Sequence, residues 1–373
     1  MFKVYPALLY QKLKNKAVRC QVCQRRCLIP EGKTGYCQSY INKNGKLYSL
    51  SYGIIAAINN DPIEKKPVFH YQPGSTCFSI GTYGCNFRCR FCQNWDIVYA
   101  DILKLKTKDK KTKVTPEETV KMALKTKAAG IAFTYNEPTV WLEYSLDVFK
   151  LAKNFTSQES RSLPRHLRGG VAKDQRPKTK NHLYTVWVTN GYATKKAIDL
   201  IAPYLDVWRV DLKSFADQFY QKLAYAPHAQ PIFENTKYIH QHYPNIHIEC
   251  VTNIIPGWND DDQNLKHIAR WIAKNLGPKT PWHVTRFYPA AQMMDTPPTP
   301  KKTLVRAKEI GQKAGLQFVY LGNIDTKDGE NTYCPNCGTL CVKRQEYSTQ
   351  ILAVNKNGCC SRCNEPLNIK IIS

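Results

Sequence analysis

Three closely spaced cysteines offer the clearest chemistry in this sequence. Cys85, Cys89 and Cys92 stand in the segment GCNFRCRFC, with three residues between the first two and two residues between the last two. Cubane iron–sulfur clusters are usually held by four thiolates, because soft sulfur ligands suit iron. Three thiolates leave one iron with an open coordination site, which chemistry at the cluster requires. The triad therefore predicts a [4Fe-4S] cluster whose remaining ligand is a substrate or a cofactor.

A zinc knuckle is the structural alternative for the triad. It would need a fourth Cys or His close by, but the nearest ones, His70 and Cys77, lie before or within the preceding apolar run. The sequence holds 15 cysteines, and all except Cys77 and Cys250 fall into three tight groups with metal-ligand spacings. This grouping favours metal ligation over disulfide bonds. Cys77 and Cys250 stand in apolar runs, so we expect both to be buried.

Two outer cysteine groups predict further metal sites. The C-terminal group has paired C-x2-C spacings, which are typical of a closed, structural zinc site, with Cys341 and Cys359 as alternative ligands. The N-terminal group has the spacing C-x2-C-x3-C-x9-C, which matches neither a typical zinc pattern nor a typical cluster pattern closely. Zinc and an auxiliary [4Fe-4S] cluster both accept four thiolates, and we favour zinc. The expected ligands are Cys334, Cys337, Cys360 and Cys363 in the C-terminal group and Cys20, Cys23, Cys27 and Cys37 in the N-terminal group.

The elements that must position these groups follow an α/β pattern. Short apolar runs alternate with helical stretches, which predicts βαβ units, a parallel sheet and a partial (β/α)6-type TIM barrel. Such barrels carry their active sites at the carboxyl ends of the strands, and the triad directly follows the first strand. The expected strands are residues 77–82, 130–135, 183–189, 207–212, 247–255, 282–288 and 316–321.

Polar residues follow several of the later strands, at the edge where the triad is expected. Taken alone, these residues are also typical of helix caps or of solvated strand ends. On the sixth strand, His283, Thr285 and Phe287 share one face and Val284, Arg286 and Tyr288 the other, and the sequence does not decide between them. The candidate residues on the earlier strands are Asn136, Glu137, Thr189, Asn190, Asp211, Lys213 and Thr252.

The expected domain organisation is a barrel with two small Cys-rich modules. Residues 1–75 form an N-terminal module with a strand hairpin, residues 76–325 form the barrel, and residues 326–373 form a zinc-ribbon-like module. A stretch at about 156–181 is rich in Ser, Arg, Lys, Gly and Pro and predicts a basic surface insertion.

The composition bounds the remaining possibilities. The chain has 373 residues, a hydrophobic fraction of 43% and a net charge of +25. The charge permits a nucleic-acid partner, but we favour a Lys-rich solvated surface because the basic segments lack aromatic platforms. No apolar run approaches the roughly 20 residues that span a bilayer, and the start lacks a cleavable signal. We expect a cytoplasmic protein without membrane association.

At the triad the sequence resembles the radical S-adenosylmethionine superfamily, whose signature has this spacing and an aromatic residue, here Phe91, before the last Cys. The resemblance implies that the methionyl amino and carboxylate groups of S-adenosylmethionine chelate the open iron. It further implies that an electron from the cluster cleaves the sulfonium bond and yields a 5′-deoxyadenosyl radical, which abstracts hydrogen. Asn136 and Glu137 then stand where the superfamily has a Gly-Gly-Glu motif, of which only the Glu matches.

The segments VTNG and DLK, which end in Gly191 and Lys213, resemble those of activating enzymes for glycyl-radical proteins. That resemblance implies that Lys213 pairs with the methionyl carboxylate, while Thr189 and Asp211 organise the polar pocket. Thr252 belongs to a fifth strand that is similar to the segment beneath the adenosyl group. Val188 replaces an expected acid, so a monovalent-cation site is not expected.

Over nearly the whole chain, the sequence resembles the radical enzymes of the AmmeMemoRadiSam system, which are similar to pyruvate formate-lyase activating enzymes. The matching segments include DPIEKKP at 61–67, residues 81–95, and ENTYCP at 330–335. The resemblance implies a protein substrate and an electron donor such as flavodoxin or ferredoxin. Two alternatives stay open: a radical enzyme that modifies RNA, and a non-catalytic zinc-binding interaction protein.

Overall fold

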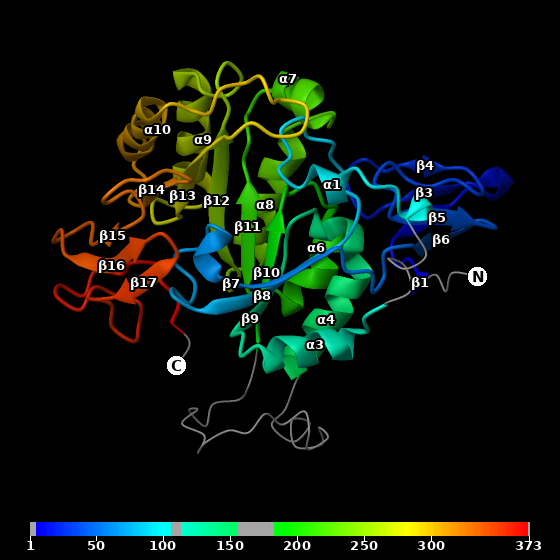
Figure 1. The fold of residues 1–373 in the computed structure, drawn as a ribbon, viewed down its shortest axis with the longest axis horizontal. Coiled ribbons are helices and arrows are strands. Elements are labelled where there is room, and N and C mark those ends of the chain that lie inside the picture. Colours follow the sequence, from blue (N-terminus) through cyan, green and yellow to red (C-terminus); the bar gives the residue numbers. More distant parts are fainter. Residues whose placement is uncertain (1–4, 106–112, 155–182, 372–373) are drawn as a thin grey trace.

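The protein is described by a computed structural model that covers residues 5–105, 113–154 and 183–371. Its centre is an eight-stranded sheet in the order β14-β13-β12-β11-β10-β9-β8-β7 (Figure 1). β7 pairs antiparallel with β8, and every other neighbouring pair is parallel. The strands are β7 (Ala57–Pro62), β8 (Thr76–Gly81), β9 (Gly130–Phe133), β10 (Tyr184–Thr189), β11 (Val207–Asp211), β12 (His247–Ile254), β13 (Trp282–Arg286) and β14 (Val319–Gly322).

The expected α/β fold with a mostly parallel sheet is confirmed. Each of the seven expected strands overlaps one of the parallel strands β8 to β14. Within the described residues, β7 and β14 form the two edges of the sheet and do not pair with each other, so the barrel is open. The structure adds β7, which the alternation of strands and helices does not predict because it joins β8 through an antiparallel ladder.

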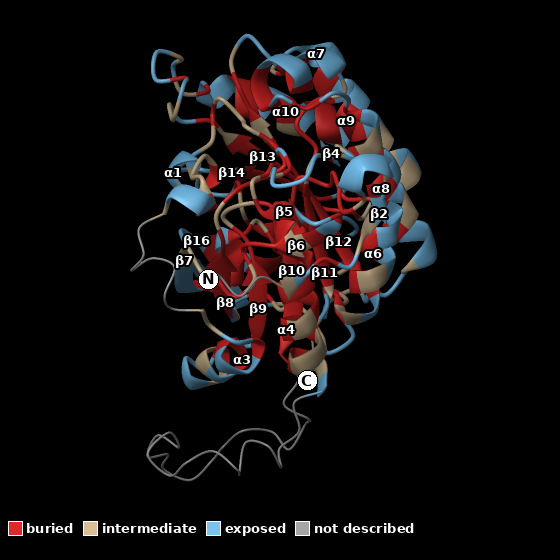
Figure 2. Ribbon diagram, turned by 90° about the vertical axis from the view of Figure 1, so that its right-hand side faces the viewer, coloured by how far each residue is buried: buried red, intermediate tan, exposed pale blue. Residues whose placement is uncertain are grey.

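Helices follow most of the parallel strands and cover the sheet. Figure 2 shows α6, α8 and α9 along one side of the strands, with exposed residues on their outer surfaces. The predicted start at Thr115 is confirmed, since Thr115 and Glu118 form a capping box and Pro116 begins the helix. The longer helices are α3 (Pro116–Lys125), α4 (Leu142–Asn154), α6 (Lys195–Ile201), α8 (Gln230–His242), α9 (Asp262–Asn275) and α10 (Lys301–Lys313).

Short helical segments and three small sheets complete the described structure. One N-terminal sheet contains β1 (Tyr5–Pro6), β5 (Tyr40–Lys43) and β6 (Lys46–Ser49). The other contains β2 (Tyr10–Lys12), β3 (Val18–Cys20) and β4 (Leu28–Ile29). The C-terminal sheet contains β15 (Thr332–Tyr333), β16 (Leu340–Gln345) and β17 (Ser348–Ile351). In Figure 1 the N-terminal and C-terminal sheets flank the central sheet on opposite sides. The short segments are α1 (Trp95–Val98), α7 (Asp217–Phe219), η1 (Lys14–Lys16), η2 (Ile63–Lys65), η3 (Ile102–Lys104), η4 (Pro138–Trp141), η6 (Ala202–Tyr204) and η7 (Tyr220–Ala224).

The alternation of side chains along β11 separates the core from the polar side of the sheet. Trp208 and Val210 are fully buried in the main hydrophobic core. Arg209 and Asp211 point the opposite way and line a cavity. β11 thus carries both a core-forming face and a charged face.

Several other sequence expectations can be compared with this structure. Cys77 and Cys250 are both completely buried, as predicted. The basic insertion at about 156–181 lies outside the described residues. None of the described helices has the length and apolar character needed to cross a membrane.

Candidate active site

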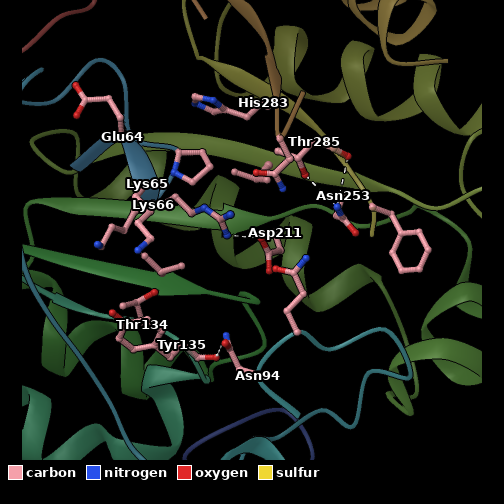
Figure 3. A pocket seen from close by; sticks show the side chains of 18 of the residues that line it. Glu64, Lys65, Lys66, Asn94, Thr134, Tyr135, Asp211, Asn253, His283 and Thr285 are labelled. Carbon is pink, nitrogen blue, oxygen red and sulfur yellow. Dashed lines mark hydrogen bonds and ion pairs between the residues drawn. The ribbon is translucent and has the colours of Figure 1, made fainter. Parts of the chain in front are cut away.

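A cavity of about 1070 Å³ opens at the carboxyl ends of the parallel strands. It is large enough for a cofactor together with part of a substrate. Figure 3 shows side chains from several strands converging on it, among them Thr134, Asp211 and Asn253. The cavity brings together, from the sequence-predicted residues, Cys85, Cys89, Phe91, Cys92, Asn136, Glu137, Thr189, Asn190, Asp211 and Lys213.

The cysteine triad forms one wall of this cavity, on the loop that follows β8. Burial raises the pKa of the Cys85 thiol well above its ordinary value, and the nearby Glu137 carboxylate raises it further. Burial likewise raises the pKa of Cys89 to about 12, although the Lys213 ammonium opposes this rise. Buried thiols of this kind lose their protons when a metal binds, because the positive metal charge stabilises the thiolate.

Two asparagines fix the triad loop to the sheet. Asn136 accepts a hydrogen bond from Thr82 N at 3.2 Å and donates one to the Gly84 carbonyl at 2.8 Å. Asn190 Nδ2 donates to Asn86 Oδ1 at 2.7 Å. The side-chain amides of Asn136 and Asn190 therefore hold the loop that carries the cysteines, in addition to lining the cavity.

Glu137 ties the end of β9 to the end of β10. Its Oε1 accepts hydrogen bonds from Thr139 N at 3.0 Å and from Thr189 Oγ1 at 2.8 Å, and its Oε2 accepts one from Asn190 N at 2.7 Å. Burial raises the pKa of the Glu137 carboxyl, while the bonds from Thr139, Asn190 and Thr189 lower it. The carboxylate caps η4, in line with the helix-cap alternative from the sequence. It also joins two strand ends that line the cavity.

Asp211 and Lys213 form a charged group beside the triad. Lys213 Nζ lies 2.8 Å from Asp211 Oδ2, and Arg209 pairs with the other oxygen of the same carboxylate. Burial opposes a charge on Lys213, but Asp211 and Cys89 raise its pKa above the ordinary value, so the ammonium stays protonated. Lys213 Nζ also lies 5.7 Å from the centre of the Phe91 ring. The pair presents a compact cation beside the cysteines.

Thr252 is the one predicted contact that the structure does not bring to the cavity. Its side chain is fully buried, donates to the Leu212 carbonyl at 2.7 Å and accepts from Trp282 Nε1 at 2.9 Å. The neighbours Val251 and Asn253 line the cavity instead. Successive residues of a strand point to opposite faces, so the segment reaches the cavity while Thr252 faces away.

The structure also shows which face of the sixth predicted strand lines the cavity, and it adds residues to the site. His283, Thr285 and Phe287 line the cavity, so this face of β13 is the inner one. Asn253 Nδ2 donates to Thr285 Oγ1 at 3.2 Å, as the dashed line in Figure 3 shows. The buried Glu249 accepts from His283 Nε2 at 2.6 Å and fixes that ring. The period-2 pattern identifies these faces but not which one is inner.

Residues around η2 contribute a charged end to the cavity. Glu64, Lys65 and Lys66 are labelled on this side in Figure 3. Lys66 Nζ lies 2.9 Å from Asp61 Oδ2, and Tyr135 OH donates to the same oxygen at 3.1 Å. The sequence marks this segment only as a family match, because its approach to the strand ends depends on β7 pairing with β8.

The four predicted C-terminal cysteines lie together. The ligand atoms of Cys334, Cys337, Cys360 and Cys363 all lie within 4.8 Å of one another. The Sγ atoms of Cys334 and Cys363 are 3.5 Å apart, and those of Cys337 and Cys360 are 3.7 Å apart. The geometry is that of a site for a single metal ion. The alternative ligands, Cys341 and Cys359, hydrogen-bond to nearby carbonyl oxygens and stand outside this set.

The N-terminal cysteines also gather, but more loosely. All four line one small cavity. Burial raises the pKa of the Cys20 thiol well above its ordinary value, and Cys23, Cys37 and Cys27 raise it further. Among the described residues, the C-terminal set is the cysteine group that shows a compact four-sulfur arrangement suited to a single ion.

The family model of the radical SAM superfamily matches residues 79–272, which contain the triad and most of the strands that line the cavity. The chain belongs to the radical SAM superfamily. An uncharacterized protein of Methanocaldococcus jannaschii is 35% identical to this radical SAM protein over 364 residues, which cover 97% of this chain and 98% of the relative.

Activating enzymes are among the more distant relatives. The isethionate sulfite-lyase activating enzyme of Oleidesulfovibrio alaskensis is 27% identical over 95 residues, or 26% of this chain and 30% of that enzyme. A solved domain of a pyruvate-formate lyase-activating enzyme from Bacteroides vulgatus superposes with a TM-score of 0.37 at 19% identity, over 52% of this chain and 99% of that domain.

Membership in the radical SAM superfamily implies a [4Fe-4S] cluster and S-adenosylmethionine, and the residues present fit both. The triad supplies three buried or half-buried thiols that line the cavity. In a cubane each thiolate binds a different iron, so three thiols on one loop can hold the cluster and leave the fourth iron open. The Lys213 ammonium beside Cys89 provides a partner for a carboxylate next to such a cluster.

Proposed function

We propose that this radical SAM protein holds its [4Fe-4S] cluster on Cys85, Cys89 and Cys92 and binds S-adenosylmethionine between that cluster and the ends of β9 to β12. The observation that supports this most is one shared cavity, which the triad, Glu137, Asp211 and Lys213 line together. When bound, the cluster and S-adenosylmethionine supply a 5′-deoxyadenosyl radical that abstracts hydrogen from a substrate.

The protein's own residues bind and orient the cofactor. Lys213 attracts the methionyl carboxylate, and Asp211 holds the ammonium in place from 2.8 Å. Phe91 places an apolar ring beside the same site. Glu137, with Thr189 and Asn190, shapes the polar wall near the methionyl amino group. Asn136 keeps the triad loop at a fixed distance from that wall.

We infer that the hydrogen donor is a protein, and that the reaction removes a hydrogen from a glycine Cα. The similarity to enzymes whose names describe lyase activation supports this inference. The remaining part of the cavity, around Lys65, Lys66 and Arg344, leaves room for a peptide segment. A reduced flavodoxin or ferredoxin would supply the electron. The resemblance of the segments at 61–67, 81–95 and 330–335 to the AmmeMemoRadiSam radical enzymes supports a place in that system.

We also propose that the C-terminal cysteines bind Zn²⁺. Four thiolates whose sulfurs all lie within 4.8 Å of one another, two pairs of them at 3.5 and 3.7 Å, suit a tetrahedral ion with Zn–S distances of about 2.3 Å. Such a closed site is structural, and it would hold the β15–β17 sheet beside the cavity. The RNA-modifying alternative rests on the net charge and on the two Cys-rich modules, which could contact nucleic acid. Superfamily membership argues against a non-catalytic interaction protein.

Anaerobic reconstitution tests the proposed function directly. The purified full chain should convert S-adenosylmethionine to 5′-deoxyadenosine and methionine when a low-potential reductant is present. A Cys85→Ala, Cys89→Ala, Cys92→Ala variant should lose about four irons and all cleavage activity, and it should retain zinc. Intact iron content without any cleavage of S-adenosylmethionine in the wild type would overturn the proposal.

A further inference from the structure

Two lysines of the segment DPIEKKP place an uncompensated positive charge in the large cavity. Asp61 Oδ1 lies 3.0 Å from Lys65 Nζ, and Asp61 Oδ2 lies 2.9 Å from Lys66 Nζ. All three residues line the cavity. Burial lowers the pKa of the Lys66 ammonium, while Asp61 opposes this effect and favours the charged form. The two lysines share one carboxylate, so the group keeps one excess positive charge.

A second group on β11 has the same composition of two cations and one carboxylate. Asp211 pairs with Arg209 through one oxygen and with Lys213 through the other. The proposed binding of S-adenosylmethionine places its single carboxylate beside Lys213, which balances the excess charge of this group. The Asp61 group has no such counter-ion. Its one excess charge matches one further carboxylate, whereas a phosphate group carries a larger charge of about −1.5 to −2.

Buried cations of both groups have hydrogen-bonding capacity that the protein does not use. Lys66 is 4% exposed, and within the described residues its Nζ makes one hydrogen bond, to Asp61. Arg209 is 8% exposed and lines the same cavity, and its Nε has no hydrogen-bond partner in the described chain. Buried polar atoms are normally hydrogen-bonded, and an unpaired one is costly. Both cations therefore indicate a ligand that carries anionic oxygens.

Glu249 connects the segment that carries Lys66 to the strand that carries Arg209. Its Oε1 accepts a hydrogen bond from His70 N at 2.7 Å. In the register of the sheet, Glu249 of β12 stands beside Arg209 of β11. Figure 3 shows the side chains of Lys66 and Asp211, the partner of Arg209, directed into the same space. Lys66 and Arg209 thus lie at the same end of the cavity.

The other acids near this end do not supply the missing negative charge. Glu249 does not line the cavity, and its carboxylate already accepts from His283 Nε2. Burial raises the pKa of Glu64, and it raises the pKa of Glu330 to about 7, which reduces the negative charge of both at neutral pH. The buried Arg344 offsets what remains. At the exposed rim, two acids and two lysines balance each other: Asp325, Glu346, Lys327 and Lys343.

Tyr135 links the Asp61 group to the triad loop. Its OH donates to Asp61 Oδ2 at 3.1 Å, while its carbonyl accepts from Asn94 Nδ2 at 2.7 Å. Asn94 stands two residues after Cys92. Tyr135 has a φ of +70°, a conformation that costs energy for a residue with a side chain and that is common at ligand sites. A substrate group bound beside Asp61 would therefore be held near the triad.

We propose that this end of the cavity binds a carboxylate of the substrate, which accepts hydrogen bonds from Lys66 and Arg209. The inference deepens the proposed function and rests on it: the glycine that loses its hydrogen lies close to an acidic side chain or to the carboxyl terminus of its chain. Lys66 and Arg209 then select the substrate by its charge, while Lys213 stays with the cofactor.

Blocked glycine peptides test this site on the reconstituted full chain with S-adenosylmethionine bound. Each peptide holds one glycine with Asp shortly before or after it, and each has an Asn counterpart. A further set combines Asn with a free C-terminal carboxylate. At least one peptide with a carboxylate should bind about tenfold more tightly than its neutral counterpart, because the counterpart lacks the charge-assisted hydrogen bonds. The set that shows the preference identifies the source of the carboxylate. Equal affinities throughout would overturn the proposal.

Two variants locate the preference. In Lys66→Met, the carboxylate peptide should lose about tenfold in affinity, and its neutral counterpart should change little. Arg209→Lys keeps a cation beside Asp211 but removes the Nε donor, so the preference should fall severalfold. Lys279→Met is the control, because Lys279 pairs with Glu365 at 2.8 Å and does not line the cavity. A full preference in Lys66→Met would refute the proposal. If that variant does not fold, the wild-type comparison and Arg209→Lys decide the question.

Two further measurements separate this site from the proposed function and from RNA binding. Cleavage of S-adenosylmethionine is measured in the same reduced sample. Cleavage without a carboxylate preference would reject the site and keep the proposed function, and a preference without cleavage would do the reverse. A short oligouridylate serves as the RNA probe. If it binds more tightly than every peptide and weakens in Lys66→Met, the site binds phosphate and the carboxylate assignment is wrong.

Discussion

Lys213 and Asp211 point to the same side of the strand end at β11, with Nζ 2.8 Å from Oδ2, and the ammonium faces the Phe91 ring of the triad loop. Asp211 is also held by Arg209, so the carboxylate cannot move without breaking two ion pairs. This arrangement fixes the position of one cation beside three cysteines. It makes the affinity for S-adenosylmethionine depend on Lys213.

Replacing Lys213 with Met should therefore weaken cofactor binding. A charge-assisted hydrogen bond contributes about 1.5–3 kcal/mol, so the dissociation constant for S-adenosylmethionine should rise about 10- to 150-fold. Equilibrium binding to the anaerobic, reconstituted protein measures this change. Lys266→Met is the matched control, because Lys266 is a half-exposed lysine of α9 that pairs only with Asp262 among the described residues. Unchanged affinity in Lys213→Met would refute this role.

Gly84 should be essential for packing the N-terminal module against the triad loop. Its φ is +85°, and an added Cβ would meet the Cys37 carbonyl oxygen at 2.3 Å. Gly84→Ala should lower the free energy of unfolding by about 3 kcal/mol or more, because it combines backbone strain with a steric clash. Gly257→Ala is the control, since Gly257 has a φ of +76° but no atom within 4 Å of an added Cβ.

That control should cost only about 1 kcal/mol. Thermal unfolding of both variants, with iron content measured in parallel, separates the effect of backbone strain from the loss of the contact between Gly84 and Cys37. Equal destabilisation of the two variants would show that the contact between Gly84 and Cys37 is not important.

Glu330 should make stability depend on pH in a predictable direction. Burial raises the pKa of this cavity-lining carboxyl from 4.5 to about 7, while Arg344 opposes the rise. The folded protein therefore binds a proton between about pH 4.5 and 7 that the unfolded chain has released. The stabilisation is complete below that window and is lost as the pH rises through 7.

The comparison of wild type with Glu330→Gln isolates this effect from metal binding. The melting temperature of the wild type should fall relative to that of the variant between pH 5 and 7.5. The carboxyl is partly exposed, so solvent screening limits the difference to about 1 kcal/mol. Parallel pH profiles for the two proteins would contradict the raised pKa.

Cys360→Ala should remove the C-terminal zinc and nothing else. The variant should lose about one zinc per chain, keep all its iron, and melt at a lower temperature, because a structural zinc site contributes directly to folding. Cys359→Ala, one residue away and outside the four-sulfur set, should keep the zinc. Iron in the wild-type C-terminal site would show that the ion is misassigned.

Local sequence patterns are sufficient to predict the parallel strands and the groups of metal-ligating cysteines. Apolar runs that alternate with amphipathic segments predict β8 to β14, since burial on both faces of a parallel sheet leaves a strong local signal. The paired C-x2-C spacings likewise predict the four sulfurs that the C-terminal module brings together. Side-chain direction was harder: Thr252 and Asn253 are adjacent and both polar, but only Asn253 lines the cavity.

Residue types and short spacings are enough to predict the triad, its place after a strand, and the seven strands whose carboxyl ends surround the cavity. These features depend on residue type and short spacing, which are local. Packing between elements sets which face of β13 is inner, and it places Asn86 between the N-terminal cysteines and the triad. Those relationships join residues far apart in the chain, and they are fixed by packing between elements, which spacing along the sequence does not encode.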